Sequence, residues 1–90
     1  MFTIVGSRTS ALLLIASMRL RSVVSRNLRL LRRKAGISQE ELADLTGLDR
    51  NTIGKLEREL SSPTVDTLES IATALQIDVE LLMRRDLPPR

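Results

Sequence analysis

The segment from residue 37 to residue 57, ISQEELADLTGLDRNTIGKLE, constrains the fold of this chain more than any other segment. It contains two short patterns typical of helices, and only Gly47 and its neighbours separate them. Neither helix can bury much apolar surface alone, because a helix this short is marginal in water by itself. The pair makes sense if the fixed angle between the two helices is what the fold has to provide.

Local signals place the ends of both helices. Ser38 followed by Glu41 fits a capping box at the start of the first helix, and Gly47 ends it. Asp49 is the expected cap of the second helix. The glycine at position 54 costs about 1 kcal/mol of helix propensity relative to alanine, so we expect it to lower the surface and let another backbone approach closely. The expected inward-facing residues of the pair are Leu42, Ala43, Ile53 and Leu56.

Three more helices are predicted around this pair. An earlier one begins at Ser22 and ends at Gly36, with its arginines at positions 26, 29 and 33 on a solvated face. A fourth begins at Thr64 or Asp66 after the loop SSPT, and a short fifth follows Asp78. The expected apolar positions are Val24, Leu28, Leu31 and Ala35 in the early helix, Leu68, Ile71, Ala72 and Leu75 in the fourth, and Val79 and Leu82 in the fifth.

The composition of the 90 residues narrows the function. Phe2 is the only aromatic residue, so the core must be aliphatic. The chain has no cysteine, which excludes a disulfide framework and thiolate metal ligands. It has no histidine, the commonest general base and transition-metal ligand. We therefore expect a protein that is not an enzyme and holds no metal or cofactor.

Charge is distributed unevenly along the chain. Residues 1–38 contain eight basic residues and no acid, whereas residues 39–90 contain six basic and eleven acidic residues. A strongly positive end favours a polyanionic partner such as nucleic acid, or an anionic membrane surface. Alternatively, these arginines pair with acids of later helices. Both can hold, because a paired arginine still contributes to the local field.

The most apolar run, ALLLIASM at residues 11–18, is too short to span a bilayer, which takes about 20 residues. Three interpretations remain open: a signal-peptide core, an extension that packs on the domain or on a partner, and an addition upstream of a natural start at Met18. The basic helix that follows disfavours secretion, so we expect a cytoplasmic protein without a membrane partner. The predicted organisation is an extension at 1–17, a domain at 18–83 and a frayed basic tail at 84–90.

The stretch from Asn27 to Met83 resembles the DNA-binding domain of the lambda-repressor/Cro-like (XRE) family. NLRLLRRKAGISQEELA looks like that family's first two helices, LDRNTIGKLE like its recognition helix, and PTVDTLESIATALQIDVELLM like its last two. The resemblance covers nearly two-thirds of the chain. It implies an all-α fold, a compact five-helix lambda-repressor-like domain whose helix-turn-helix presents one helix to a major groove.

The resemblance also implies the site residues. Gln39 would contact a phosphate and brace a recognition side chain, and Arg58 would contact the DNA backbone. Arg32 and Glu57 match a partly buried ion pair between the first and third helices. The groove-facing positions of the third helix are Arg50, Asn51, Thr52 and Lys55.

Three positions depart from the family pattern. Glu59 replaces a usual glycine, which puts an acid near the expected phosphate path. Thr46 stands where an aliphatic residue is usual, and Gly54 shortens the recognition surface.

The leading hypothesis is a sequence-specific, double-stranded DNA-binding transcriptional regulator, a repressor that acts as a homodimer on a two-fold operator. The alternative is a protein-interaction module, an antitoxin or adaptor whose helices grip a partner such as a toxin and whose apolar residues 11–18 form a docking arm. Polymerase is a further possible protein partner of the regulator.

Overall fold

The computed structural model describes residues 19–88, and these residues fold into five helices without a strand. The all-α, five-helix expectation is therefore confirmed. The predicted apolar extension at 1–17 lies outside the described residues, and the domain boundaries stay predictions. The helices are α2 (Leu20–Lys34), α3 (Gln39–Thr46), α4 (Arg50–Glu57), α5 (Val65–Leu75) and α6 (Val79–Leu82).

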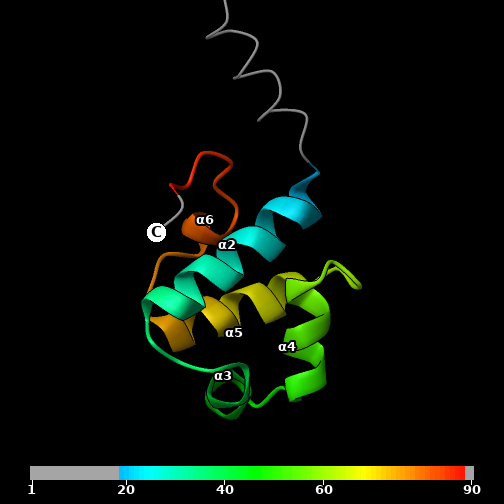
Figure 1. Ribbon diagram of the computed structural model, residues 1–90, viewed down its shortest axis with the longest axis vertical. Helices are drawn as coiled ribbons and strands as arrows, with labels where there is room; N and C mark the ends of the chain where they lie inside the picture. The colour runs from blue at the N-terminus through cyan, green and yellow to red at the C-terminus, as the bar shows by residue number, and fades with distance from the viewer. Residues whose placement is uncertain (1–18, 89–90) are drawn as a thin grey trace, which may run out of the picture.

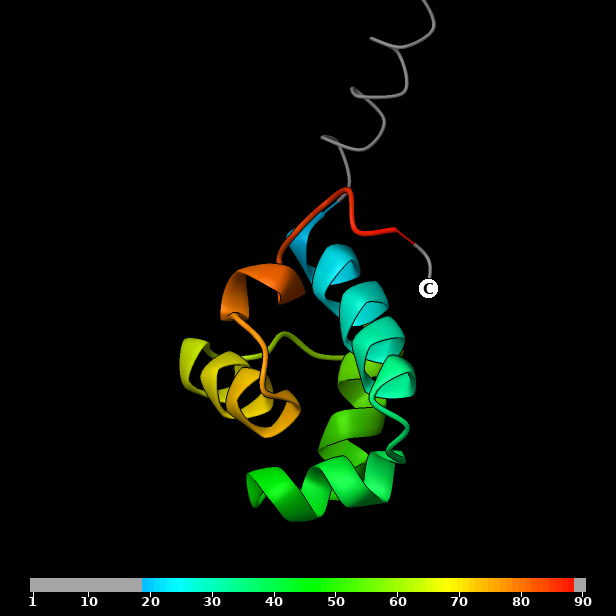
Figure 2. The ribbon, with the colours of Figure 1, turned by 90° about the vertical axis from the view of Figure 1, so that its left-hand side faces the viewer.

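The helices surround one core (Figure 1). The longest helix, α2, packs against α4 and α6, while α5 packs against α3 and α6. Figure 2 shows α2 and α5 on opposite sides of the molecule, with α3 closing one end between them. The helices α3 and α4 also pack against each other. This arrangement gives the α3–α4 pair support from both longer helices.

The core is aliphatic, as the composition requires. Each helix contributes one apolar side chain with no exposed surface: Leu28, Leu42, Ile53, Ile71 and Leu82. Full burial of such a side chain stabilises the fold by about 1.5–3 kcal/mol relative to its exposed state. The inward positions predicted for α3 and α4 are confirmed, and those of α5 and α6 are all buried or half-buried.

The predicted helix ends of the central pair are also confirmed. The Glu41 backbone N–H donates to the Ser38 hydroxyl at 3.0 Å, and the Ser38 backbone N–H donates to the Glu41 carboxylate at 2.8 Å. Gly47 has a φ of 74° and ends α3 in the left-handed conformation that glycine adopts at low cost. The Asp49 side chain accepts from the Asn51 N–H and starts α4.

The buried face of α2 agrees with the prediction at Val24 and Leu28 and differs from it elsewhere. The helix begins at Leu20, before Ser22, and it runs on to Lys34. Ala35 is exposed and Leu31 is only half-buried, whereas Ser25 and Asn27 are almost completely buried. The apolar spacing misled because these two polar side chains bond to backbone carbonyl groups of later segments, which rotates the contact face of α2 towards them.

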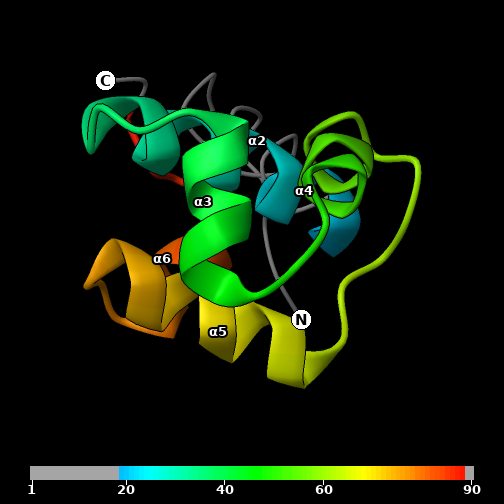
Figure 3. The same ribbon diagram turned by 90° about the horizontal axis from the view of Figure 1, so that it is seen from below.

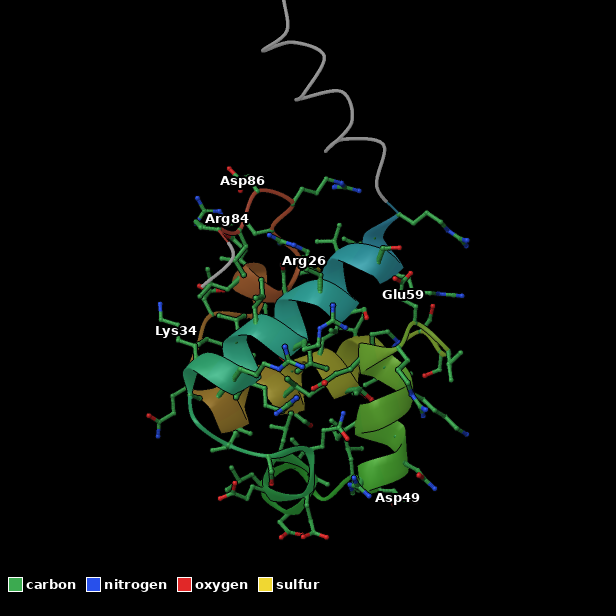
Figure 4. All side chains as sticks on the ribbon, viewed as in Figure 1. Arg26, Lys34, Asp49, Glu59, Arg84 and Asp86 are labelled. Carbon is green, nitrogen blue, oxygen red and sulfur yellow. The ribbon has the colours of Figure 1, made fainter. Side chains whose placement is uncertain are left out.

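The tail was expected to be frayed, and that expectation is wrong for residues 84–88, which are bonded to α2. Arg26 was expected to be solvated, and that expectation is also wrong. The Arg26 guanidinium donates to the Leu87 carbonyl at 2.6 Å. Asn27 Nδ2 donates to the Arg84 carbonyl at 2.7 Å and to the carbonyls of Leu81 and Leu82 at 3.1 and 3.2 Å. Figure 4 shows Arg26 on the side of α2 that faces this segment. The carbonyl groups at the end of α6 thus find their donor on α2.

The loop after α4 explains the first departure from the family pattern. Glu59 has a φ of 61°, a left-handed conformation that a glycine would adopt without a Cβ penalty. Its carboxylate accepts a hydrogen bond from the Ser22 hydroxyl at 2.6 Å. In Figure 4, Glu59 lies beside the start of α2. The chain therefore makes the turn that a glycine usually makes, at some cost in backbone strain.

Replacing Glu59 by glycine and by alanine separates this strain from the hydrogen bond. Both variants lose the Ser22 contact, but only the glycine variant relieves the left-handed backbone. We expect Glu59→Gly to be more stable to urea unfolding than Glu59→Ala by about 1 kcal/mol. Equal stability of the two variants would contradict a strained backbone at this position.

Candidate nucleic-acid interface

The turn between α3 and α4 is held by backbone and side-chain hydrogen bonds. The Leu48 N–H donates to the Ala43 carbonyl at 3.1 Å. Thr46, the second departure from the family pattern, donates its hydroxyl to the Leu42 carbonyl at 2.8 Å, so its polar group is satisfied within α3. Figure 3 shows α3 in front and α4 beside it, seen almost end-on from its amino terminus. The turn thus projects the first residues of α4 away from the core.

The predicted recognition residues do not all lie in one place. Arg50, Asn51, Lys55 and Arg58 are exposed, whereas Gln39 and Thr52 are half-buried. A recess of about 280 Å³ lies between Gln39 of α3 and residues of α4 and its carboxyl end. Thr52 and Lys55 do not line this recess. Its lining residues are Gln39, Arg50, Asn51, Gly54 and Arg58.

Glu57, at the end of α4, is buried and only 3% exposed. Arg32 Nε donates to Oε2 at 2.5 Å and Arg32 Nη2 donates to Oε1 at 3.0 Å, a bidentate pair between α2 and α4. The hydrogen bond to Glu57 raises the pKa of Arg32 above its ordinary value, although burial acts in the opposite direction. The guanidinium therefore stays charged, and the stability that its charge contributes is lost only in strongly alkaline solution.

Gln39 takes part in the same network. Its Nε2 donates to Glu57 Oε1 at 3.1 Å, so α3 is joined to the ion pair of α2 and α4. The resemblance implied that Gln39 braces a recognition side chain. In the structure its Nε2 binds the buried carboxylate, which fixes the orientation of the amide, and the bracing role stays a prediction.

Two residues of this network were missed by the sequence analysis. The Glu57 carbonyl accepts from the Ser25 hydroxyl at 2.7 Å and from Arg29 Nη1 at 2.9 Å. Arg29 was expected to be solvated, and that expectation is wrong because its guanidinium binds the end of α4. The signal was present in the spacing: Ser25, Arg29 and Arg32 lie four and three residues apart, on one face of α2.

The expected close backbone approach at Gly54 does not occur. A Cβ at this position would lie 3.7 Å from two side-chain atoms, Arg58 Nη2 and Gln39 Oε1, and would meet no backbone outside its own helix. Arg58 Nε donates to the Gly54 carbonyl at 3.1 Å, which holds the arginine over the recess.

Within residues 19–88, no helix is long and apolar enough to cross a membrane. The same range contains no group of three or more acidic side chains placed to hold a metal ion.

Comparison with known proteins supports this geometry. The helix-turn-helix family model matches residues 28–82. The control protein C.SmaI of Serratia marcescens is 37% identical over 71 residues, which cover 79% of this chain and 84% of that protein. The solved structure of the hypothetical transcription factor NHTF from Neisseria has a TM-score of 0.71 at 39% identity and covers 79% of this chain and 78% of its own. The restriction-modification controller protein C.AhdI from Aeromonas hydrophila has a TM-score of 0.67 at 39% identity, covering 69% of this chain and 94% of its own.

The fold and these matches define a transcriptional regulator with a helix-turn-helix DNA-binding fold. Within that class, the chain belongs to the XRE family, as its resemblance to lambda-repressor/Cro-like domains predicted.

Removing one partner of the buried pair should be costly. Arg32→Met leaves the Glu57 carboxylate without its bidentate partner, and we expect the free energy of unfolding to fall by about 3–5 kcal/mol. The double variant Arg32→Met with Glu57→Leu removes both charges and should recover a large part of that loss in urea titrations.

A matched control is the exposed pair of Arg84 and Asp86, whose side chains are 56% and 64% exposed. Its removal by Asp86→Asn should cost less than about 1 kcal/mol. If the double variant at positions 32 and 57 were as unstable as Arg32→Met alone, the charge of Glu57 would not be what Arg32 compensates.

Proposed function

We propose that this protein is a sequence-specific regulator that binds double-stranded DNA through α4 and acts in the cytoplasm. The observation that carries the proposal is the exposed amino-terminal part of α4, where Arg50 and Asn51 project beside Gln39 from a rigidly held helix. An arginine can pair with the O6 and N7 atoms of guanine, and an asparagine with the N6 and N7 atoms of adenine. Thr52 can meet a thymine methyl group or a phosphate, and Lys55 extends the same face.

Contacts to the DNA backbone supply affinity in this proposal. Arg58 and Gln39 are the residues assigned to phosphate. Positive side chains release counterions when they bind phosphates, so the affinity falls as the salt concentration rises. The bonds of Arg29 and Arg32 within the fold argue for a structural role of these two arginines.

A homodimer fits the small size of the recognition helix. The eight residues of α4 can reach only a few base pairs, whereas two copies on a two-fold operator double the contacts and fix the spacing of half-sites. Repression would follow from occlusion of a promoter. The likeness to a control protein and a restriction-modification controller protein supports a role in setting gene expression, with polymerase as a further partner.

The first test is selection of bound sites from random duplex DNA, with an enriched symmetric site expected. On that site, Arg50→Ala and Asn51→Ala should each cost about 1–3 kcal/mol and relax the preference at the contacted base pair. Gln39→Ala should weaken binding with less change in preference, as a phosphate contact does.

Lys34→Ala is the charge-matched control, because Lys34 lies at the far end of α2 from the loop that follows α4 (Figure 4). Its removal should leave the site preference unchanged. Equal losses of Arg50→Ala on every duplex tested would remove that arginine from base recognition.

A second candidate is a protein-interaction module that binds a toxin or another protein. Three large apolar side chains favour it, since Leu45, Leu60 and Val65 are 61%, 64% and 77% exposed. Such side chains can also be the contact between two copies of the chain.

Deleting residues 1–17 tells these functions apart. A DNA-binding dimer that joins through the described domain should keep its affinity per dimer in fluorescence anisotropy and its dimeric mass in light scattering. A monomeric truncated protein would assign the dimer contact to the deleted segment. Loss of a protein partner with intact folding would favour the interaction module.

A further inference from the structure

Gly54 is a glycine that the fold does not need. It lies inside α4 with an ordinary helical backbone, unlike Gly36 and Gly47, whose φ values are positive. A Cβ added there would find only two contacts, both at 3.7 Å and both at the ends of flexible side chains. Alanine therefore fits without movement, and it is the better helix former. Because glycine weakens the helix, we look for the role of Gly54 in the space that its missing side chain leaves open.

That space is the recess between α3 and α4, where Arg50, Asn51 and Arg58 offer hydrogen-bond donors and Gln39 Oε1 is an acceptor. Arg50 and Arg58 bring guanidinium groups to it, and Asn51 brings an amide. Within residues 19–88, Arg50 makes no hydrogen bond or ion pair through its side chain, and Arg58 uses only its Nε. The nearby Glu57 carboxylate is already neutralised by Arg32, so it does not oppose an incoming oxygen.

We propose that Gly54 is part of the DNA-binding site, where it keeps the recess open for a hydrogen-bond-accepting oxygen of duplex DNA. The oxygen would sit between Arg50 and Arg58, over the backbone of α4, where a methyl group would exclude it. This oxygen belongs either to a phosphate or to the O6 edge of a guanine, since both accept from a guanidinium. The inference rests on the proposed DNA-binding function and deepens it.

Gln39 defines the other wall of the recess. Because its Nε2 donates to Glu57, its Oε1 faces Gly54 and lies 3.7 Å from the position of an added Cβ. The buried ion pair thus shapes the recess as well as the fold. A side chain at position 54 would narrow the space between this amide and Arg58 without touching the core.

The test uses the full chain with Gly54→Ala. We expect Tm to rise by about 4–8 °C, because alanine stabilises the helix. Affinity for the duplex that the wild-type protein selects should fall at least about tenfold, the change that loss of one strong contact produces. The control is Ser70→Ala, an exposed position of α5 that lies outside the recess and also gains helix propensity. It should leave DNA binding unchanged.

The two sources of the oxygen give different results. A guanine contact predicts a loss on the selected duplex that is absent on a scrambled duplex, together with a changed preference at one base pair. A phosphate contact predicts similar losses on both duplexes and a salt slope reduced by about one. If Gly54→Ala is more stable and binds the selected duplex as tightly as the wild-type protein, the recess takes no part in recognition. If the wild-type protein selects no duplex, the proposed function itself has failed.

Discussion

The structure depends on keeping one carboxylate satisfied away from water. Glu57 ends α4 with only 3% of its surface exposed, and an unpaired charge in that place would cost several kcal/mol. Arg32 from α2 and Gln39 from α3 satisfy its oxygens, while Ser25 and Arg29 satisfy its carbonyl. The hydrogen bonds to Glu57 therefore fix the positions of α2, α3 and α4 relative to one another.

The same network links the fold to the surface. Gln39 is half-buried, with its amide nitrogen on the ion pair and its oxygen towards the recess. A surface residue that is oriented by a buried charge has fewer conformations to lose when a ligand arrives. In this way the α3–α4 pair becomes a preorganised unit rather than two short helices with free side chains.

Features with a local cause could be predicted from the sequence. The capping box of Ser38 and Glu41 and the turn at Gly47 depend on neighbours within a few residues, so their signatures are readable in one dimension. The buried face of α2 could not be predicted in the same way. Ser25 and Asn27 are buried because of carbonyl groups 32 and 55 residues away, and nothing near them in the sequence indicates those partners.

In the candidate site, too, the features with a local cause could be predicted from the sequence and those that depend on long-range packing could not. Exposure of Arg50 and Asn51 followed from the cap at Asp49 and the helical period, whereas the bonds of Arg29 and Gln39 needed the packed structure. The loop after α4 shows the limit of analogy. The missing glycine at position 59 was visible in the sequence, but the left-handed backbone there and the bond from the hydroxyl at position 22 were not.

The amide of Asn27 has a consequence for how the domain is made. It joins the middle of α2 to the carbonyl groups of residues 81, 82 and 84, which a ribosome adds much later. Until those residues emerge, the amide is a polar group with no partner in a segment that otherwise collapses, and the four-residue α6 has no stability of its own. Native packing of α2 must therefore wait until residues 81–84 have been made, and a nascent fragment that stops short of α6 stays open to proteases.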